Sequence, residues 1–454
     1  MALAVAVYSL SARAAQDAAL NATECLPSCA KQYRTLAEIV LSCFTTIFLC
    51  IWVSLHLNVP EPVDTEGMNT FKKFKVWIRL FIRCNVIPVI VTLVFPEWVL
   101  GMAVLQFRKA TRLAKEIGIT RQHGFFIIMG GFHLFERSQA PSNQIRAGDK
   151  DGETHPLVKG EGDERTSNDK TCVVEEFDTP IHPLDEFDVR HLIYTGKLRL
   201  PTTAELRDKC KNDGIAKFLV ILQTLWFIAQ CITRKVRKLP LTELEVITLG
   251  YTLLTVLMYI AWWDKPYRVT FPIRVYEALP ERTYQQREQK RRMQEESFWG
   301  MTIGYAMGLQ SDSIELRSVK QAPMFHSGSM NEVYDAGDFL CVITTVIVGV
   351  LFGGVHFLAW SSPFPSAQMQ FLWRLATLIM TATPLAAVAG MVISAIINQM
   401  SDGLGVVFLY CLCVLPPCYF VGRGITIVIA LVTLSALSLD IYQDVEWSNL
   451  FPHI

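Results

Sequence analysis

The sequence lacks the short motifs that identify most soluble enzymes. It holds no phosphate-binding P-loop, no GxSxG nucleophile motif, no HExxH zinc motif and no aspartate-rich pair for diphosphates. It also lacks a CxxC pair among its 12 cysteines, which excludes a zinc knuckle and a thioredoxin-like redox site. Spacings such as His182-x-x-Asp185 are too loose for a metal site. We therefore assign no catalytic residue, no metal and no cofactor from the sequence.

Charged residues are also scarce. They make up 19% of the 454 residues, whereas hydrophobic residues make up 51%. This balance is typical of membrane proteins. Lys and Arg together equal Asp and Glu in number, so the net charge gives no sign of a nucleic-acid partner. The expected partners are the lipid bilayer and a small lipophilic ligand.

The clearest membrane signal is Leu219–Val269, where a short basic connection joins two apolar runs. Each run reaches the length of about 20 residues that a helix needs to cross the hydrocarbon core. The connection holds four cations, which predict a cytosolic loop: Arg234, Lys235, Arg237 and Lys238. Thr242 and Glu245 predict a capping box at the start of the second helix.

Apolar runs on both sides of this hairpin predict an all-α fold, a polytopic transmembrane helical bundle with about seven to eight membrane segments. The predicted order is a signal peptide over 1–15, a short lumenal N-terminus over 16–35, membrane segments with an amphipathic helix over 36–107, a polar region over 108–214 with a disordered insertion at 138–178, the hairpin over 215–264, a polar charged region over 265–338, a four-segment membrane bundle over 339–443 and a tail over 444–454.

The N-terminus has features of an exported chain. Residues 1–15 resemble a signal peptide, although a basic start is missing. Asn21 begins a glycosylation sequon, and Cys25 and Cys29 are candidates for a disulfide in an oxidising lumen. We expect an integral membrane protein of the secretory pathway or plasma membrane with its N-terminus lumenal or extracellular.

Two N-terminal segments leave alternatives open. Phe71–Arg83 alternates cations with large apolar residues, so it forms either an interfacial amphipathic helix or a basic lead-in to the next span. Residues 84–107 are broken by Phe95-Pro96-Glu97. They either span as a kinked helix or dip into the membrane, with a new helix beginning at Pro96.

The C-terminal third holds two further features. Gly349 and Gly353 form a small-residue stripe for close helix contact, including self-association between chains. The last two apolar runs, Gly403–Val421 and Gly424–Tyr442, form either a tight hairpin or one helix broken at Pro416-Pro417.

Ionisable residues in or beside the apolar runs are the candidate ligand-contacting groups at membrane depth. They are Glu97, Glu245, Asp264 and His356. Some also have ordinary structural explanations. Glu97 and Glu245 lie in a first helical turn, where the helix dipole favours an acid. His356 fits a satisfied core histidine.

Several stretches resemble a large group of fungal integral membrane proteins. These stretches are HGFFIIMGGF from His123, LQTLWFIAQC from Leu222, LPLTELE from Leu239, WWDKP from Trp262 and the C-terminal FPHI. The resemblance covers most of the chain. Members of the group more often have Asn where this chain has Asp264. The group carries no established activity, so the resemblance implies origin and topology but no chemistry.

Three classes of function stay open. Broken apolar segments with polar residues favour a transport, channel or small-ligand-binding membrane protein. An intramembrane enzyme acting on a lipophilic substrate would need two of the four ionisable candidates to converge at membrane depth. A structural or assembly subunit needs no site. The positions of the four candidates relative to one another therefore discriminate between these classes.

Overall fold

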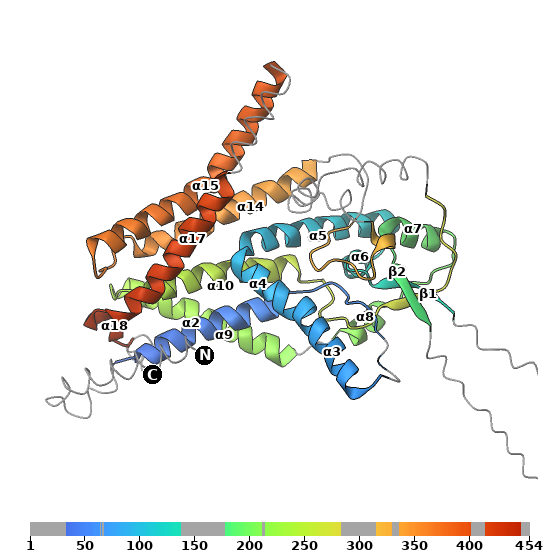
Figure 1. Ribbon diagram of the computed structural model, residues 1–454, viewed down its shortest axis with the longest axis horizontal. Coiled ribbons are helices and arrows are strands. Elements are labelled where there is room, and N and C mark those ends of the chain that lie inside the picture. Colours follow the sequence, from blue (N-terminus) through green and yellow to red (C-terminus); the bar gives the residue numbers. More distant parts are fainter. Residues whose placement is uncertain are drawn as a thin grey trace, which may run out of the picture.

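The computed structural model describes residues 33–63, 65, 68–137, 178–210, 214–282, 315–328, 336–400 and 414–445. The signal peptide, Asn21, Cys25, Cys29, nearly all of the 138–178 insertion and the C-terminal FPHI lie outside the described residues. The described chain is mostly helical, as predicted (Figure 1). Among the described residues, six helices are long and apolar enough to cross a membrane: Leu36–Ser54, Thr70–Val94, Phe218–Val236, Glu243–Ala261, Ala367–Ile397 and Leu415–Ser435.

The predicted hairpin consists of α9 (Gly214–Val236) and α10 (Glu243–Ala261), and α10 lies at the centre of the bundle. Besides α9, four helices pack against α10: α2 (Leu36–Ser54), α5 (Pro96–Ile117), α14 (Ala336–Val355) and α17 (Leu415–Val432). Consequently α10 is the most buried of the six candidate spans, which fits a helix that is apolar on nearly all sides.

The two ends of the bundle differ in what they carry. At one end α2 begins, α9 turns into α10, and the C-terminal α18 (Leu439–Tyr442) lies beside them; we call this the terminal end (Figure 1). The opposite end, the domain end, carries α6 (Arg121–Ile128), α7 (Glu186–Tyr194), α8 (Thr203–Lys209) and a small sheet.

This arrangement corrects the predicted orientation. The sequence analysis placed the N-terminus in the lumen and the Arg234–Lys238 connection in the cytosol. In the structure Arg34, just before α2, donates a hydrogen bond from Nε to the Ile441 carbonyl at 2.9 Å, and Arg234 donates to the same carbonyl at 3.0 Å. Both segments therefore lie at the terminal end, and one of the two predicted placements is wrong.

The chain reverses direction at Phe95, where the side chains of Leu93, Val94 and Phe95 are each more than a third exposed. A continuous rod of α3 (Thr70–Phe81), a π-helical turn (Ile82–Val86) and α4 (Ile87–Val94) runs inward from the domain end (Figure 1). Phe95 leaves the helical conformation (φ −130°, ψ 52°), and α5 then begins at Pro96, as predicted, and returns to α6. Proline suits this position because the first turn of a helix needs no N–H donor there. Residues 84–107 thus form two helices that meet at a sharp turn.

At the domain end, the two predicted polar regions, 108–214 and 265–338, contribute strands to one small sheet. Strand β1 (Phe132–Glu136) pairs with β2 (Thr179–Pro183) in antiparallel fashion and with β3 (Ile273–Val275) in parallel fashion. Gly130 adopts a left-handed φ of 78° in the tight turn from α6 into β1. Arg317 forms an ion pair with the buried Asp188 at the start of α7, so the 315–328 segment is held onto this unit.

The C-terminal helices differ from the prediction at one boundary. The structure has α15 (Ala367–Met400), with Pro384 in its interior, packed along α17. The predicted interruption between Val421 and Gly424 is wrong, because α17 runs without a break from Leu415 to Val432. Pro416 occupies the first turn of α17, a position that proline favours. Residues 401–413, on which the alternative of one helix broken at Pro416-Pro417 depends, lie outside the described residues.

The Gly349 and Gly353 stripe lies against α15 of the same chain. A Cβ atom added at Gly349 would lie 3.0 Å from Cγ of Pro384, and one added at Gly353 would lie 2.9 Å from the backbone of Thr381. The two glycines therefore permit close packing of α14 on α15 beside the proline.

We predict that Gly353→Ala destabilises the protein by about 1–3 kcal/mol, because the new methyl group meets backbone that cannot move independently. Gly354→Ala is the matched control, since a Cβ there would meet no atom within 4 Å. It should be neutral or slightly stabilising, because alanine has the higher helix propensity. The measurement is the temperature at which each detergent-purified variant stops being monodisperse. Equal temperatures for the two variants would contradict the packing described here.

Candidate functional site

A buried ion pair lies where the chain reverses at Phe95. Glu97, in the first turn of α5, accepts hydrogen bonds from Nη1 of Arg423 at 3.0 and 3.1 Å. The hydroxyl of Tyr419 donates to the same carboxylate at 2.7 Å. Only 7% of Glu97 and 4% of Arg423 is exposed. Both charges are therefore removed from solvent and compensated by each other.

The second terminal nitrogen of Arg423 is connected to the backbone at the helix break through the Tyr251 hydroxyl. Nη2 of Arg423 donates to the Tyr251 hydroxyl at 2.7 Å, and that hydroxyl donates in turn to the Leu93 carbonyl. The last carbonyls of a helix have no hydrogen-bond partner within the helix. The Tyr251 hydroxyl therefore supplies the donor that the Leu93 carbonyl lacks at the end of α4. The ring of Phe352 lies 4.6 Å from the guanidinium carbon. We call Glu97, Tyr251, Tyr419 and Arg423 the Glu97 cluster.

The Glu97 cluster lies at the middle of the bundle. Tyr251 is near the centre of α10 (Glu243–Ala261), roughly 12–15 Å from either end at about 1.5 Å per residue. The tip of the reversal is fixed at the same depth, because the Phe95 ring packs edge-on against Phe420 of α17 with centroids 4.7 Å apart. Three helices from distant parts of the chain thus meet at one polar point.

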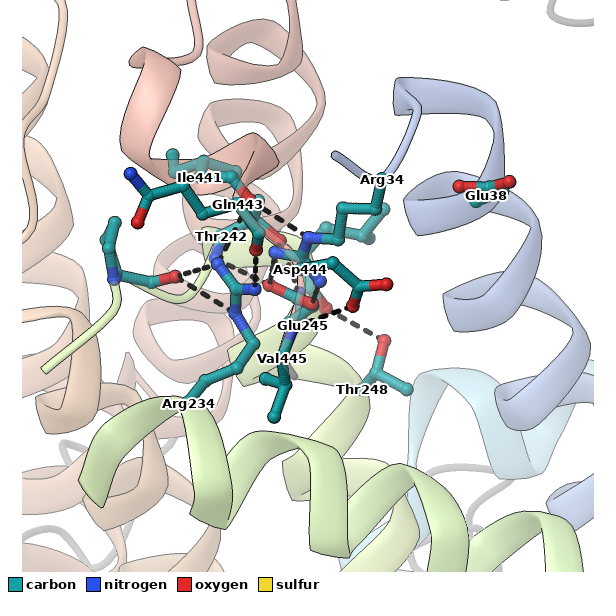
Figure 2. A network of polar contacts seen from close by, with 12 residues as sticks. Arg34, Glu38, Arg234, Thr242, Glu245, Thr248, Ile441, Gln443, Asp444 and Val445 are labelled. Carbon is teal, nitrogen blue, oxygen red and sulfur yellow. Dashed lines mark hydrogen bonds and ion pairs between the residues drawn. The ribbon is translucent and has the colours of Figure 1, made fainter. Parts of the chain in front are cut away.

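Glu245 lies in a different network, at the terminal end (Figure 2). It closes the predicted capping box, accepting a hydrogen bond from the backbone N–H of Thr242 at 2.8 Å. Its carboxylate also pairs with both terminal nitrogens of Arg34, one of them at 3.1 Å. Glu245 therefore joins the start of α10 to the start of α2.

Arg234 extends this terminal network to the C-terminal segment (Figure 2). Its guanidinium donates to the carbonyls of Pro240 at 2.9 Å, Ile441 at 3.0 Å and Gln443 at 2.7 Å. Only 2% of Arg234 is exposed. Its charge is therefore taken up by backbone oxygens and does not remain free in the connecting loop.

The other two predicted candidates lie apart from each other and from Glu245. His356 is buried, with Nδ1 2.8 Å from the Phe352 carbonyl and its ring against Phe352 and Trp373. It neighbours the Glu97 cluster through Phe352. Asp264 pairs with Arg121 at 2.6 Å at the domain end, where its side chain is 34% exposed.

The four predicted candidates therefore do not converge. Glu97, Glu245 and Asp264 each pair with a different arginine, and His356 bonds to backbone. Within the part of the chain that the structure describes, no group of three His, Cys, Asp or Glu side chains is placed to hold a metal ion.

Two buried cations were missed from the sequence. Arg423 fell between two predicted helices, although a single arginine within an apolar run is itself a signal. Lys265, in the WWDKP stretch, is fully enclosed and donates to Asn58 Oδ1 at 2.9 Å and Gln106 Oε1 at 3.0 Å. Burial lowers the pKa of Lys265 well below its usual value. The lysine joins the domain end of α10 to α5 and to the segment after α2.

Comparison with known proteins adds one finding. A family model described as "Family of unknown function (DUF8562)" matches residues 4–283. The chain belongs to this family. The part matched to DUF8562 contains Glu97, Glu245 and Asp264 but ends before Tyr419 and Arg423. No curated protein and no solved structure matches the chain. Membership of DUF8562 thus assigns no chemistry to the Glu97 cluster.

We predict that Glu245→Gln destabilises the protein by about 3–5 kcal/mol, because the Arg34 charge loses its partner in a nearly buried site. Glu38→Gln is the matched control. Glu38 closes an equivalent capping box with Thr35 but is exposed and, in Figure 2, points away from the network. Glutamine keeps the cap in both variants, so Glu38→Gln should cost about 1 kcal/mol or less. Thermal midpoints of the purified variants check this, and similar losses for both would refute a special role for Arg34.

Proposed function

We propose that the protein binds and transports a small ligand within the membrane, with the Glu97 cluster as the ligand site. The observation that carries this proposal is a helix break that coincides with a buried ion pair at the middle of the bundle. Ionisable groups at membrane depth are costly and are usually functional.

The reversal at Phe95 supports the proposal on backbone grounds. Irregular backbone at membrane depth is tolerated only where protein encloses it or where it lines a cavity. In transporters with broken helices, the N-termini of half-helices face anionic groups of the substrate, and the carbonyls freed by the break coordinate the coupled cation. Here the N-terminus of α5 and the Leu93 carbonyl meet at the Glu97 cluster. The α3–α4 rod and α5 enter and leave at the domain end, as a re-entrant segment does.

The ion pair supports a ligand that carries a carboxylate or another small anionic group. Such a group would compete with Glu97 for the guanidinium of Arg423, which binds carboxylates in bidentate fashion. The positive end of the α5 dipole favours an anion at the same place.

The two other classes of function have less support. An intramembrane enzyme needs converging ionisable groups, whereas Glu97, Glu245, Asp264 and His356 lie apart. A structural or assembly subunit needs no ligand site, and it is the function we would adopt if the following experiment fails.

The test compares ligands retained by purified protein, identified by mass spectrometry. We expect wild-type protein to retain an anionic metabolite or lipid that Glu97→Gln/Arg423→Gln loses at least about tenfold, since losing a charged hydrogen bond costs roughly 1.5–3 kcal/mol. Both charges are removed together because a lone buried charge costs about 3–5 kcal/mol in stability. Arg121→Gln/Asp264→Asn is the matched control, since it removes a partly exposed acid–arginine pair.

A deletion strain provides the second readout of the same experiment. The control variant should restore the metabolite profile of the strain, and the Glu97→Gln/Arg423→Gln variant should not. If the cluster variant folds, keeps the ligand and restores the profile, the Glu97 cluster is not the ligand site.

For localisation we propose the secretory pathway or plasma membrane, with the terminal end lumenal or extracellular and the domain end cytosolic. Cations beside the apolar segments support this orientation. The domain end carries them in Lys72–Arg83 and Arg108–Lys115. The Arg234–Lys238 connection counts for less, because Arg234 is bound by carbonyls. Fungal origin and about seven to eight membrane segments remain further proposals. The Gly349 and Gly353 stripe packs on α15 of the same chain, so it gives no support to self-association.

We predict that Asn21 is glycosylated, because a lumenal N-terminus exposes its sequon to the glycosylation machinery. Asn21→Gln should then abolish a mobility shift that an endoglycosidase also removes. A sequon created by Lys197→Asn/Arg199→Thr, at two exposed positions of the domain end, should remain unmodified. Modification of the second sequon but not the first would reverse the proposed orientation.

A further inference from the structure

Helix α3 (Thr70–Phe81) leaves two chemically opposite faces without protein partners. None of its residues is buried. Lys72, Lys75 and Arg79 recur at intervals of three and four, so they lie on one face. Phe74, Trp77 and Phe81 recur at the same intervals on the opposite face. Lys73 lies between the two faces. A basic and an aromatic face that are both exposed are typical of a helix at a membrane surface.

The basic face has no acid to neutralise it among the residues that the structure describes. Lys72, Lys73, Lys75, Arg79 and Arg83 are all exposed, and no described carboxylate pairs with any of them. By contrast, Arg282 and Arg317 at the same end of the bundle are paired with Asp185 and Asp188. The cations of α3 are therefore available to an external anionic surface.

The aromatic face forms a continuous stripe. The rings of Phe74, Trp77 and Phe81 stack in sequence, with centroids 6.1 and 5.4 Å apart. Trp77 is 58% exposed, and the stripe leads toward the exposed Ile87 and Ile90 of α4. Aromatic residues prefer the interfacial zone of a bilayer, whereas the apolar helix that follows belongs in its core.

Helix α3 lies where a bilayer surface is expected. The preceding helix α2 emerges at the domain end, where the N–H of Val59 donates to the Met129 carbonyl at 2.9 Å. Figure 1 shows α3 crossing obliquely to α2 and α9 before α4 enters the bundle. Lys and Arg stems can extend along the interface from such a helix while their charged ends reach the headgroups.

We propose that α3 is a binding surface for the anionic phospholipid headgroups of the leaflet at the domain end. The basic face contacts headgroup phosphates and carboxylates, and the aromatic stripe lies at the level of the glycerol backbone. Each Lys or Arg held near an anionic membrane surface raises partitioning roughly fivefold. The proposal does not depend on the Glu97 cluster, since the two share no residue.

The experiment measures lipid selectivity of the full chain in nanodiscs. Protein is reconstituted with phosphatidylcholine alone or mixed with phosphatidylserine, and the lipids retained after extraction are counted by native mass spectrometry. We expect wild type to retain phosphatidylserine preferentially. Lys72→Gln/Lys75→Gln/Arg79→Gln should lower that preference at least about tenfold, and the charge-preserving Lys72→Arg/Lys75→Arg should keep it.

Arg199→Gln/Arg207→Gln/Lys209→Gln is the matched control, since these three cations are exposed at the same end but have no aromatic stripe beside them. Equal losses in both triple variants would show a general charge effect and overturn the proposal. Unchanged selectivity in the α3 variant would overturn it too. Displacement of the bound lipid by millimolar inorganic phosphate would show a small-anion site, and a second copy of the chain in place of lipid would show a protein interface.

Discussion

The structure depends on satisfying polar backbone groups where a helix stops in the middle of an apolar bundle. The break at Phe95 leaves the Leu93 carbonyl without a helical partner. Tyr251 and Arg423 supply the missing donors, and Glu97 supplies the charge that Arg423 requires. Helices α5, α10 and α17 must therefore meet at this depth, which fixes how the remaining helices pack around α10.

Buried charges in this protein connect segments that are far apart in the sequence. Glu97 pairs with Arg423, Glu245 with Arg34, and Asp188 with Arg317. Each pair is satisfied in only one relative placement of its two segments, because a displaced partner would leave a charge buried alone. The pairs thus specify the register between helices whose apolar surfaces alone would allow sliding. This positional role accounts for charges that add little net stability.

Local patterns predicted local structure well. The α9–α10 hairpin, the Thr242–Glu245 capping box and the helix start at Pro96 each depend on residues a few positions apart. The partners of Glu97 and Glu245 could not be predicted, because they lie hundreds of residues away and a single sequence carries no pairing information. The same limit applies to the predicted placement of the N-terminus and the Arg234–Lys238 connection on opposite sides: the shared Ile441 carbonyl and the Arg34–Glu245 pair bring both to one end.

The contact between the segment before α2 and the segment after α18 has a consequence for the order of folding. The N–H of Arg34 donates to the Tyr442 carbonyl at 2.7 Å, and Tyr33 forms a β-bridge with Gln443. Arg34 and Arg234 therefore reach the Ile441 carbonyl only after α18 has been synthesised. Until then Arg34 can pair with Glu245, and Arg234 can donate to the Pro240 carbonyl. The α18 segment thus closes the terminal end only after the helices that precede it have been made.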